Sequence, residues 1–360
     1  PKNSRGRRIG MMQLIPLIKD AWENNRDSLK TDASNLTSRL KRRQINRTSD
    51  ADISLDIMEK AFRSFQSRYD EKLGGFGSAP KFPKAHDYSF LIKYWKRTGD
   101  KIALDMSEFS LKAMRNGGMY DQVGFGFHRY STDAKWLAPH FEKMLYDQAI
   151  LVQAYLDAYQ ATGLQYYADV VDEILTYVLR DMTSVEGGYY SAEDADSEGE
   201  EGKFYVWNIN EAESILGKED ADLYRMVFNL KSGGNWNEGY KHKTNIPHLK
   251  KTLFALSEQL NMSEKELSNR LVEIREKLFA IREKRVHPQK DDKILTDWNG
   301  LMIAAMARAG AVLNNEKYAF SAIGAMDFIL KNLYNKDGSL LKRYRHGNTG
   351  ITGMLDDYAF

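Results

Sequence analysis

Apolar residues recur at helical spacing along most of the chain, and short polar stretches separate the apolar ones. One stripe holds Ile53, Ile57, Met58, Ala61 and Phe65, most of them three or four residues from the next. Residues at this spacing share one helix face, because an α-helix turns once in 3.6 residues. The same pattern predicts helices at 11–22, 53–65, 90–95, 102–114, 144–159, 166–179, 261–285, 298–313 and 318–333.

Six of these predicted helices form three pairs, because a short polar turn joins the members of each pair. The turns lie at 97–100, 161–164 and 314–316, and a long loop follows each second helix. Strand-like stretches lie inside long loops rather than between paired helices, which argues against an alternating βαβ sheet. The pattern predicts an all-α fold of helical hairpins closed in a ring, an α/α toroid with β-hairpin-like loops at one end.

The composition is that of a globular protein and excludes several classes. Of 360 residues, 42% are hydrophobic and 12% aromatic, so the chain is not mainly disordered. No run of 18 apolar residues occurs, and we expect no membrane span. The chain has no cysteine, which excludes disulfides and thiolate chemistry within this sequence. The net charge of +2 argues against nucleic acid as the main partner.

The charge is unevenly distributed, and both ends of the chain look cut. Residues 1–50 hold 12 Lys and Arg against 5 Asp and Glu. Such a basic segment is either a solvated helix face or an interaction surface. The chain begins at Pro1 without an apolar leader, and 353–360 has the pattern of a helix that stops in its second turn. We therefore expect a fragment, with the cytoplasm as the default location.

The first candidate site is the loop region 120–143, which is rich in ionisable and aromatic residues. It contains Asp121, His128, Arg129, Trp136 and His140. Histidine exchanges protons near neutral pH, arginine binds oxyanions, and aromatic rings stack on sugars or bases. The alternative is structural, with His140 capping a helix and Asp121 fixing a loop.

Spacing suggests a common face for three polar residues in this region. His140, Lys143 and Asp147 lie three and four residues apart, as on one side of a helix. The sequence therefore predicts that they belong to the first turns of the helix at 144–159.

The second candidate site is the acidic stretch 191–202. Its carboxylates start with the spacing of a calcium loop, but Tyr205 occupies the position where a bidentate glutamate is required. A hairpin with a solvated acidic tip is the simpler interpretation. Glu193 and Asp194 remain candidates for acid–base chemistry or for binding hydroxyl groups.

Two further candidate regions lie near the C-terminus. Asp297, Trp298 and Asn299 open a predicted helix, and His346 follows a basic, aromatic loop. Thr296 or Asp297 as a helix N-cap explains one of these residues without any function. The pair His242 and His248 is a weak metal signal, and we predict neither a metal nor a cofactor, because phosphate-loop, nucleophile-elbow and zinc-protease motifs are absent from the sequence.

Five strings carry a resemblance to a known family. They are GGFGSAPKFP at 74–83, GMYDQVGFGFHRY at 118–130, PHFEKMLYD at 139–147, YSAEDADS at 190–197 and LTDWNGLM at 295–302. In this order they resemble the spermatogenesis-associated protein 20-like proteins, which are widespread in bacteria and archaea. The resemblance covers nearly the whole chain.

The resemblance implies a fold and a domain order. Family members have a thioredoxin-like domain with a Cys-x-x-Cys-type motif, followed by an (α/α)6 barrel of the six-hairpin glycosidase type, akin to N-acylglucosamine 2-epimerases. Residues 1–47 would be the last helix of the upstream thioredoxin-like domain and a linker. Residues 48–360 would be the barrel, incomplete at its C-terminal end.

Two functions are consistent with these features. The first is a carbohydrate-processing enzyme, like an epimerase, isomerase or hydrolase, that takes a small sugar-like ligand. The expected catalytic residues are His140, His128, Glu193 and Asp194. The expected binding residues are Asp121, Arg129, Trp136, Asp297, Trp298, Asn299 and His346. The alternative is a redox or protein-handling factor, in which the thioredoxin-like domain is active and the barrel binds a ligand or client.

Overall fold

The computed structural model describes residues 9–45, 56–236 and 243–360. The chain divides into two compact units, Pro1–Ile57 and Met58–Phe360. The predicted domain boundary at residue 47 and the candidate ligand His242 both lie outside the described residues.

Residues 9–45 of the first unit form two helices. They are α1 (Met11–Asn24) and α2 (Arg26–Ile45), and α1 has no buried residue. The sequence predicted α1 but not α2, because few apolar residues interrupt the charged and polar positions of α2.

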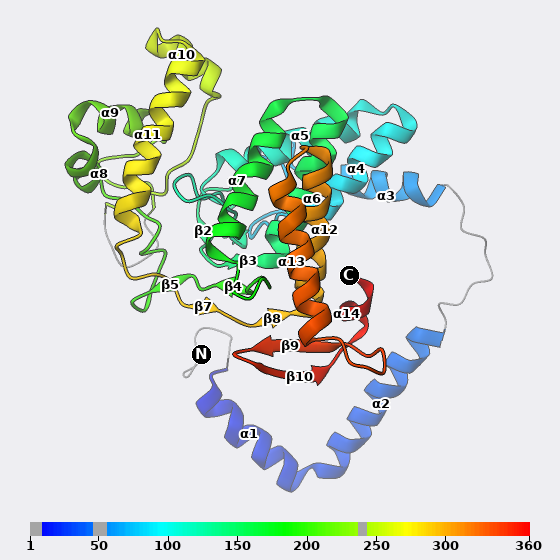
Figure 1. Cartoon of the computed structure of the whole chain (residues 1–360). Coiled ribbons are helices and arrows are strands. Elements are labelled where there is room, and N and C mark those ends of the chain that lie inside the picture. The colour runs from blue at the N-terminus through cyan, green and yellow to red at the C-terminus, as the bar shows by residue number, and fades with distance from the viewer. Residues whose placement is uncertain (1–8, 46–55, 237–242) are drawn as a thin grey trace. The chain divides into compact units, whose positions relative to one another are not determined.

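The second unit is built from helical hairpins, as the spacing of turns predicted. Within each hairpin the two helices pack on each other, and the first helices α4, α6 and α12 also pack side by side in that order. They form an inner row, backed by α5, α7 and α13 (Figure 1). The bounds are α3 (Asp56–Gln66), α4 (Ala85–Thr98), α5 (Lys101–Asn116), α6 (Leu145–Thr162), α7 (Gln165–Asp181), α12 (Thr296–Val312), α13 (Glu316–Asn332) and α14 (Leu355–Ala359).

Burial differs between the two rows. Inner helix α6 has 11 buried residues among its 18, on all of its sides, because helices flank it on both edges and α7 backs it. The turns inside the hairpins are tight because Gly99 and Gly163 end their helices with φ of 78° and 70°, a region that glycine enters without strain. The predicted all-α fold of the α/α toroid type is confirmed.

Short strands connect the long loops at one end of the inner helices. Three sheets have the orders β1–β2, β3–β4–β7 and β10–β9–β8, and a fourth pairs β5 with β6. The strands are β1 (Tyr130–Ser131), β2 (Pro139–His140), β3 (Lys143–Met144), β4 (Ala192–Glu193), β5 (Asp196–Ser197), β6 (Glu200–Glu201), β7 (Lys290–Asp291), β8 (Ile294–Leu295), β9 (Leu341–Arg345) and β10 (Asn348–Thr352).

A lobe with its own apolar core is inserted between α7 and α12. Its helices are α8 (Ile209–Leu216), α9 (Lys218–Val227), α10 (Leu253–Leu260) and α11 (Glu264–Arg282). Trp207, Leu267 and Ile274 are fully buried in this second core. The sequence predicted only α11, because α8, α9 and α10 have 8 to 10 residues each and show too few turns of a periodic pattern. One of the strand-like stretches of the sequence, 203–207, forms turns at 203–205 and a single bridge between Trp207 and Asn245.

Candidate functional site

The four loop regions with candidate chemistry meet at the N-terminal ends of the inner helices. Strand pairing brings Lys143 opposite Glu193 and Ala192 opposite Asp291, which joins the first three regions in one sheet. The hairpin of β9 and β10 joins them through β8, below α12 and α13 in Figure 1. The loops are therefore neighbours in space although up to 200 residues separate them in sequence.

His140 lies at the partly exposed centre of this loop layer. Its Nδ1 is 2.6 Å from Glu201 Oε1, and its Nε2 is 3.3 Å from Glu142 Oε2. The hydrogen bond with Glu201 raises the pKa of His140 above its usual value. The side chain keeps 26% of its surface exposed, so this imidazolium is accessible to a ligand. The acidic stretch 191–202 therefore contacts His140, but through Glu201 rather than through the predicted Glu193 or Asp194.

Arg129 completes the charged cluster. Its Nη1 donates to Glu142 Oε2 at 2.8 Å, so Glu142 is shared between Arg129 and His140. Arg129 also interacts electrostatically with the Tyr146 hydroxyl. Together with Glu201, the cluster holds two basic and two acidic side chains, and Arg129 and His140 supply N–H donors that can bind a ligand oxygen.

Asp147, in the first turn of α6, is the most unusual carboxylate of this region. It is 5% exposed, and its Oδ2 is buried without a hydrogen-bond partner among the described residues. Burial raises its pKa to about 8, although the charge of Arg129 acts in the opposite direction. A carboxyl group of this kind exchanges its proton near neutral pH, as a general acid must.

An aromatic pair lies beside these ionisable groups. The rings of Tyr146 and Trp298 are 4.8 Å apart at an angle of 66°, and both are partly exposed. They come from the first turns of α6 and α12. Trp298 was predicted as a stacking surface, and its partial exposure allows that role.

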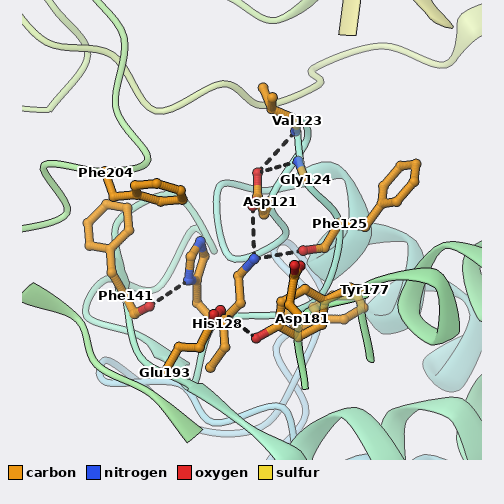
Figure 2. A network of polar contacts seen from close by, with 12 residues as sticks. Asp121, Val123, Gly124, Phe125, His128, Phe141, Tyr177, Asp181, Glu193 and Phe204 are labelled. Carbon is orange, nitrogen blue, oxygen red and sulfur yellow. Dashed lines mark hydrogen bonds and ion pairs between the residues drawn. The ribbon is translucent and has the colours of Figure 1, made fainter. Parts of the chain in front are cut away.

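Other predicted site residues belong to a buried network that fixes the loops (Figure 2). The Asp121 carboxylate accepts bonds from Lys143 Nζ and Arg282 Nη1, both at 2.8 Å, and from the amides of Val123 and Gly124. Although burial opposes ionisation, Arg282 and Lys143 hold the pKa of Asp121 well below its usual range. With these acceptor positions occupied and its exposure at 6%, Asp121 is a structural anchor rather than a ligand-binding residue.

His128 is in the same interior and differs sharply from His140. It is 2% exposed, and its Nδ1 donates to the Phe141 carbonyl at 2.9 Å. Burial and the neighbouring Lys143 charge lower its pKa to about 3, so the ring is neutral at physiological pH. His128 therefore does not fit the predicted role as partner of His140 in acid–base catalysis.

The two predicted carboxylates of the acidic stretch, Glu193 and Asp194, differ in burial. Glu193 is buried and accepts from the Tyr177 hydroxyl at 2.7 Å, with Lys290 Nζ 3.4 Å away. Asp194 is exposed, and its Oδ1 accepts from the backbone of Asp196. Glu193 therefore anchors the sheet, and neither residue contacts His140.

Trp136 and Asn299 are core residues, which corrects their predicted role in binding. Trp136 is 1% exposed and donates through Nε1 to the Leu73 carbonyl at 3.0 Å. Asn299 is fully buried and holds both backbone groups of Tyr189, at 2.8 and 3.0 Å. Their side chains are occupied inside the protein, so neither presents a face to a ligand.

The remaining predicted residues lie in ion pairs of the β8–β10 region. Asp297 Oδ2 is 2.6 Å from Lys342 Nζ, while its Oδ1 is buried without a described partner. His346 is exposed in the turn after β9, with its Nε2 2.7 Å from Asp292.

The sequence did not single out Glu142, Tyr146, Asp147 and Glu201 as site residues. The spacing of His140, Lys143 and Asp147 was noticed, but the first two lie in β2 and β3, and α6 begins only at Leu145. A period of two could have identified Glu142. In extended backbone, side chains two residues apart, such as His140 and Glu142, point to the same side.

Two general properties follow from the described part of the chain. No group of three or more His, Asp or Glu side chains there is arranged to hold a metal ion. None of the described helices is both long and apolar enough to cross a membrane.

The fold and the loop layer define a helical-hairpin protein of the α/α toroid class. Comparison with known proteins gives its relatives. The chain is 35% identical to mouse spermatogenesis-associated protein 20 and 34% identical to the human protein, each over 98% of this chain. It is thus homologous to spermatogenesis-associated protein 20 over nearly its whole length, which confirms the resemblance inferred from its motifs. The chain spans about half the length of these curated relatives.

Solved structures show a more distant likeness. A cellobiose 2-epimerase from Bacillus thermoamylovorans matches 84% of this chain and 92% of its own, with 11% identity and a TM-score of 0.35. A D-mannose isomerase matches 86% of this chain and 97% of its own, with 13% identity and a TM-score of 0.34. Likeness at this level says nothing about function. No family model matches the chain.

Proposed function

We propose that this protein processes a small carbohydrate at the loop layer, at the N-terminal ends of α6 and α12. The observation that carries the proposal is the placement of His140 between Glu142 and Glu201, in the same loop layer as the buried Asp147, whose Oδ2 has no hydrogen-bond partner among the described residues. These side chains offer one accessible imidazolium and one carboxyl group whose pKa is about 8.

The cluster supplies what a proton transfer on a sugar needs. His140, whose pKa is raised by its hydrogen bond with Glu201, donates a proton to a sugar oxygen from its protonated form, and Asp147 gives or takes a second proton near neutral pH. Arg129 orients an oxygen atom, and Trp298 offers an apolar face to the ring. This set suits an epimerase- or isomerase-like proton shift beside a carbonyl carbon, or a hydrolysis that protonates the leaving oxygen.

The test is a set of variants in the full-length protein, assayed against a library of mono- and disaccharides. We expect His140→Asn and Asp147→Asn each to lower turnover by about 10²–10⁴-fold, the range for general acid–base groups. Trp298→Ala should mainly raise KM, because stacking contributes to ground-state binding.

His287→Asn is the matched control, since His287 is exposed and its ring contacts Glu283 and Phe204 rather than Glu142 or Glu201. Full turnover in both His140→Asn and Asp147→Asn refutes the proposal. An activity that instead depends on cysteines of an upstream thioredoxin-like domain favours the redox alternative.

A further inference from the structure

A separate groove on the second unit has a one-sided charge. It has a volume of about 420 Å³ and lies between the end of α5, the loops at 72–73 and 135–137, and the inserted lobe at 229–235 and 248–250. Its lining includes Lys72, Lys135, Lys231 and Lys250 but no carboxylate. All four lysines are exposed, and none lies within ion-pair distance of a carboxylate among the described residues.

Two other cavities of the described chain are lined by charges of both signs. The cavity of about 540 Å³ beside α8 contains Arg285 together with its partner Glu211, 2.7 Å away. The cavity of about 350 Å³ beside α7 contains Arg115 and its partner Glu173, 2.8 Å away. Four unpaired lysines around one concave surface repel each other, and a bound anion relieves that repulsion.

The walls of the groove are fixed before any ligand binds. Asn229 Nδ2 donates to His248 Nε2 at 2.8 Å, while His248 Nδ1 donates to the Ile246 carbonyl at 3.0 Å. Burial also lowers the pKa of His248, so the ring is a neutral wall and the lysines alone supply the charge. The Asn235 side chain donates through Nδ2 to the Ile246 carbonyl and accepts through Oδ1 from the Ile246 N–H.

One carboxylate lies near the groove, and it is already engaged. Asp133 influences the titration of His248, but it accepts from the backbone amides of Lys135, Leu137 and Ala138. It therefore offers no free oxygen to pair with a lysine.

We propose that this groove binds a small phosphorylated ligand. Lysine ammonium groups bind phosphate as point charges, and the volume falls within the usual range for a small-molecule site. Leu73, Leu137 and Leu249 line the groove below the lysines and suit the uncharged body of such a ligand. The proposal is independent of the chemistry at His140.

The test is calorimetric titration of the intact chain with glucose 6-phosphate, inorganic phosphate and glucose. We expect both phosphate-bearing probes to bind, binding to weaken as salt rises, and glucose not to bind at this groove. The double variant Lys135→Gln/Lys250→Gln should raise Kd at least about tenfold. Lys96→Gln, an exposed lysine of α4 outside the groove, should leave Kd unchanged.

Three results overturn the proposal: no binding of either phosphate-bearing probe at millimolar concentration, an unchanged Kd in the double variant, or equal binding of glucose and glucose 6-phosphate through the groove. A fourth is lysine-dependent binding of a single-stranded oligonucleotide when both small probes fail, which assigns the groove to nucleic acid. Thermal unfolding of each variant verifies that the fold is intact, as expected for exposed lysines.

Discussion

At the scale of single residues, burial decides what a titratable side chain can do. His128 and His140 lie 12 residues apart in one motif, yet the pKa of the first falls to about 3 and that of the second rises. The sequence predicted both as catalytic because residue type and spacing carry no information on solvation. Burial of His128 depends on Phe141 and Tyr205 rings packed around it, and Tyr205 comes from a loop 77 residues away.

The raised pKa of Asp147 predicts a pH-dependent stability. An unfolded aspartate ionises near pH 4, whereas the folded one ionises near pH 8, so the folded state binds more protons between these values. Stability should therefore fall as pH rises from about 4 to about 8. Asp147→Asn removes this loss, and we expect the variant to gain several kcal/mol relative to the parent protein across that range.

Urea unfolding at several pH values measures this difference. Asp169→Asn, at an exposed position of α7, serves as the control for the loss of a helix carboxylate. If Asp147→Asn and the parent differ in free energy of unfolding by the same amount at pH 4 and at pH 8, the ionisation of Asp147 does not control this stability.

At the scale of elements, two inner helices bind the loop at the end of the preceding hairpin in the same way. In each case a side-chain amide bonds to both the N–H and the C=O of one loop residue, an arrangement called a clamp here. The fourth residue of α12, Asn299, binds the N–H and C=O of Tyr189. The fourth residue of α6, Gln148, binds the N–H and C=O of Phe127 at 2.9 and 2.7 Å. Each amide thus ties a glycine–aromatic loop to the inner helix of the next hairpin.

This clamp predicts a large loss of stability on truncation. Asn299→Ala and Gln148→Ala each leave a buried N–H and C=O without partners, at an expected cost of about 2–5 kcal/mol in the free energy of unfolding. Asn348→Ala, on the exposed strand β10, should change it by less than about 0.5 kcal/mol. Denaturant titration measures all three, and a cost below about 1 kcal/mol for both buried variants argues against the clamp.

The elements themselves were predictable to different degrees. Long helices with sustained periodicity, such as α7 and α13, were found within about two residues of their true ends, because the pattern arises from burial of one face. The predicted turns at 97–100 and 161–164 are also confirmed, because Gly99 and Gly163 are the C-caps of α4 and α6. The strands were poorly located because most have two residues and owe their extended form to pairing across the loop layer.

At the scale of the whole molecule, the hairpin order predicted the α/α toroid but not the partners of the site. Pairing of β3 with β4 and of β4 with β7 follows from how three hairpins stack, and no local pattern encodes it. The four candidate regions do meet at one end, as expected from a ring of hairpins. Which side chains face outward there, including Glu142 and Glu201, depends on that three-dimensional pairing.

The buried ion cluster of Asp121 links the main apolar core of the second unit to the core of the inserted lobe. Arg282 ends α11 in the inserted lobe, and Asp121 and Lys143 belong to loops next to α6. Removing one charge leaves two cations buried with less compensation, which costs far more than the loss of an exposed pair. We expect Asp121→Asn to lower the free energy of unfolding by about 3–5 kcal/mol.

Hydrogen exchange measured in α11 and in α6 distinguishes a link between the two cores from a general loss of stability. Hydrogen exchange in Asp121→Asn should accelerate in both α11 and α6, because each loses its tie to the other core. Asp220→Asn is the matched control within the lobe: it removes the more exposed pair with Arg270 and should cost about 1 kcal/mol or less. If exchange in α11 stays at the parent rate while Asp121→Asn is destabilised, the cores are not coupled through this cluster, and the lobe must be held by its apolar contacts alone.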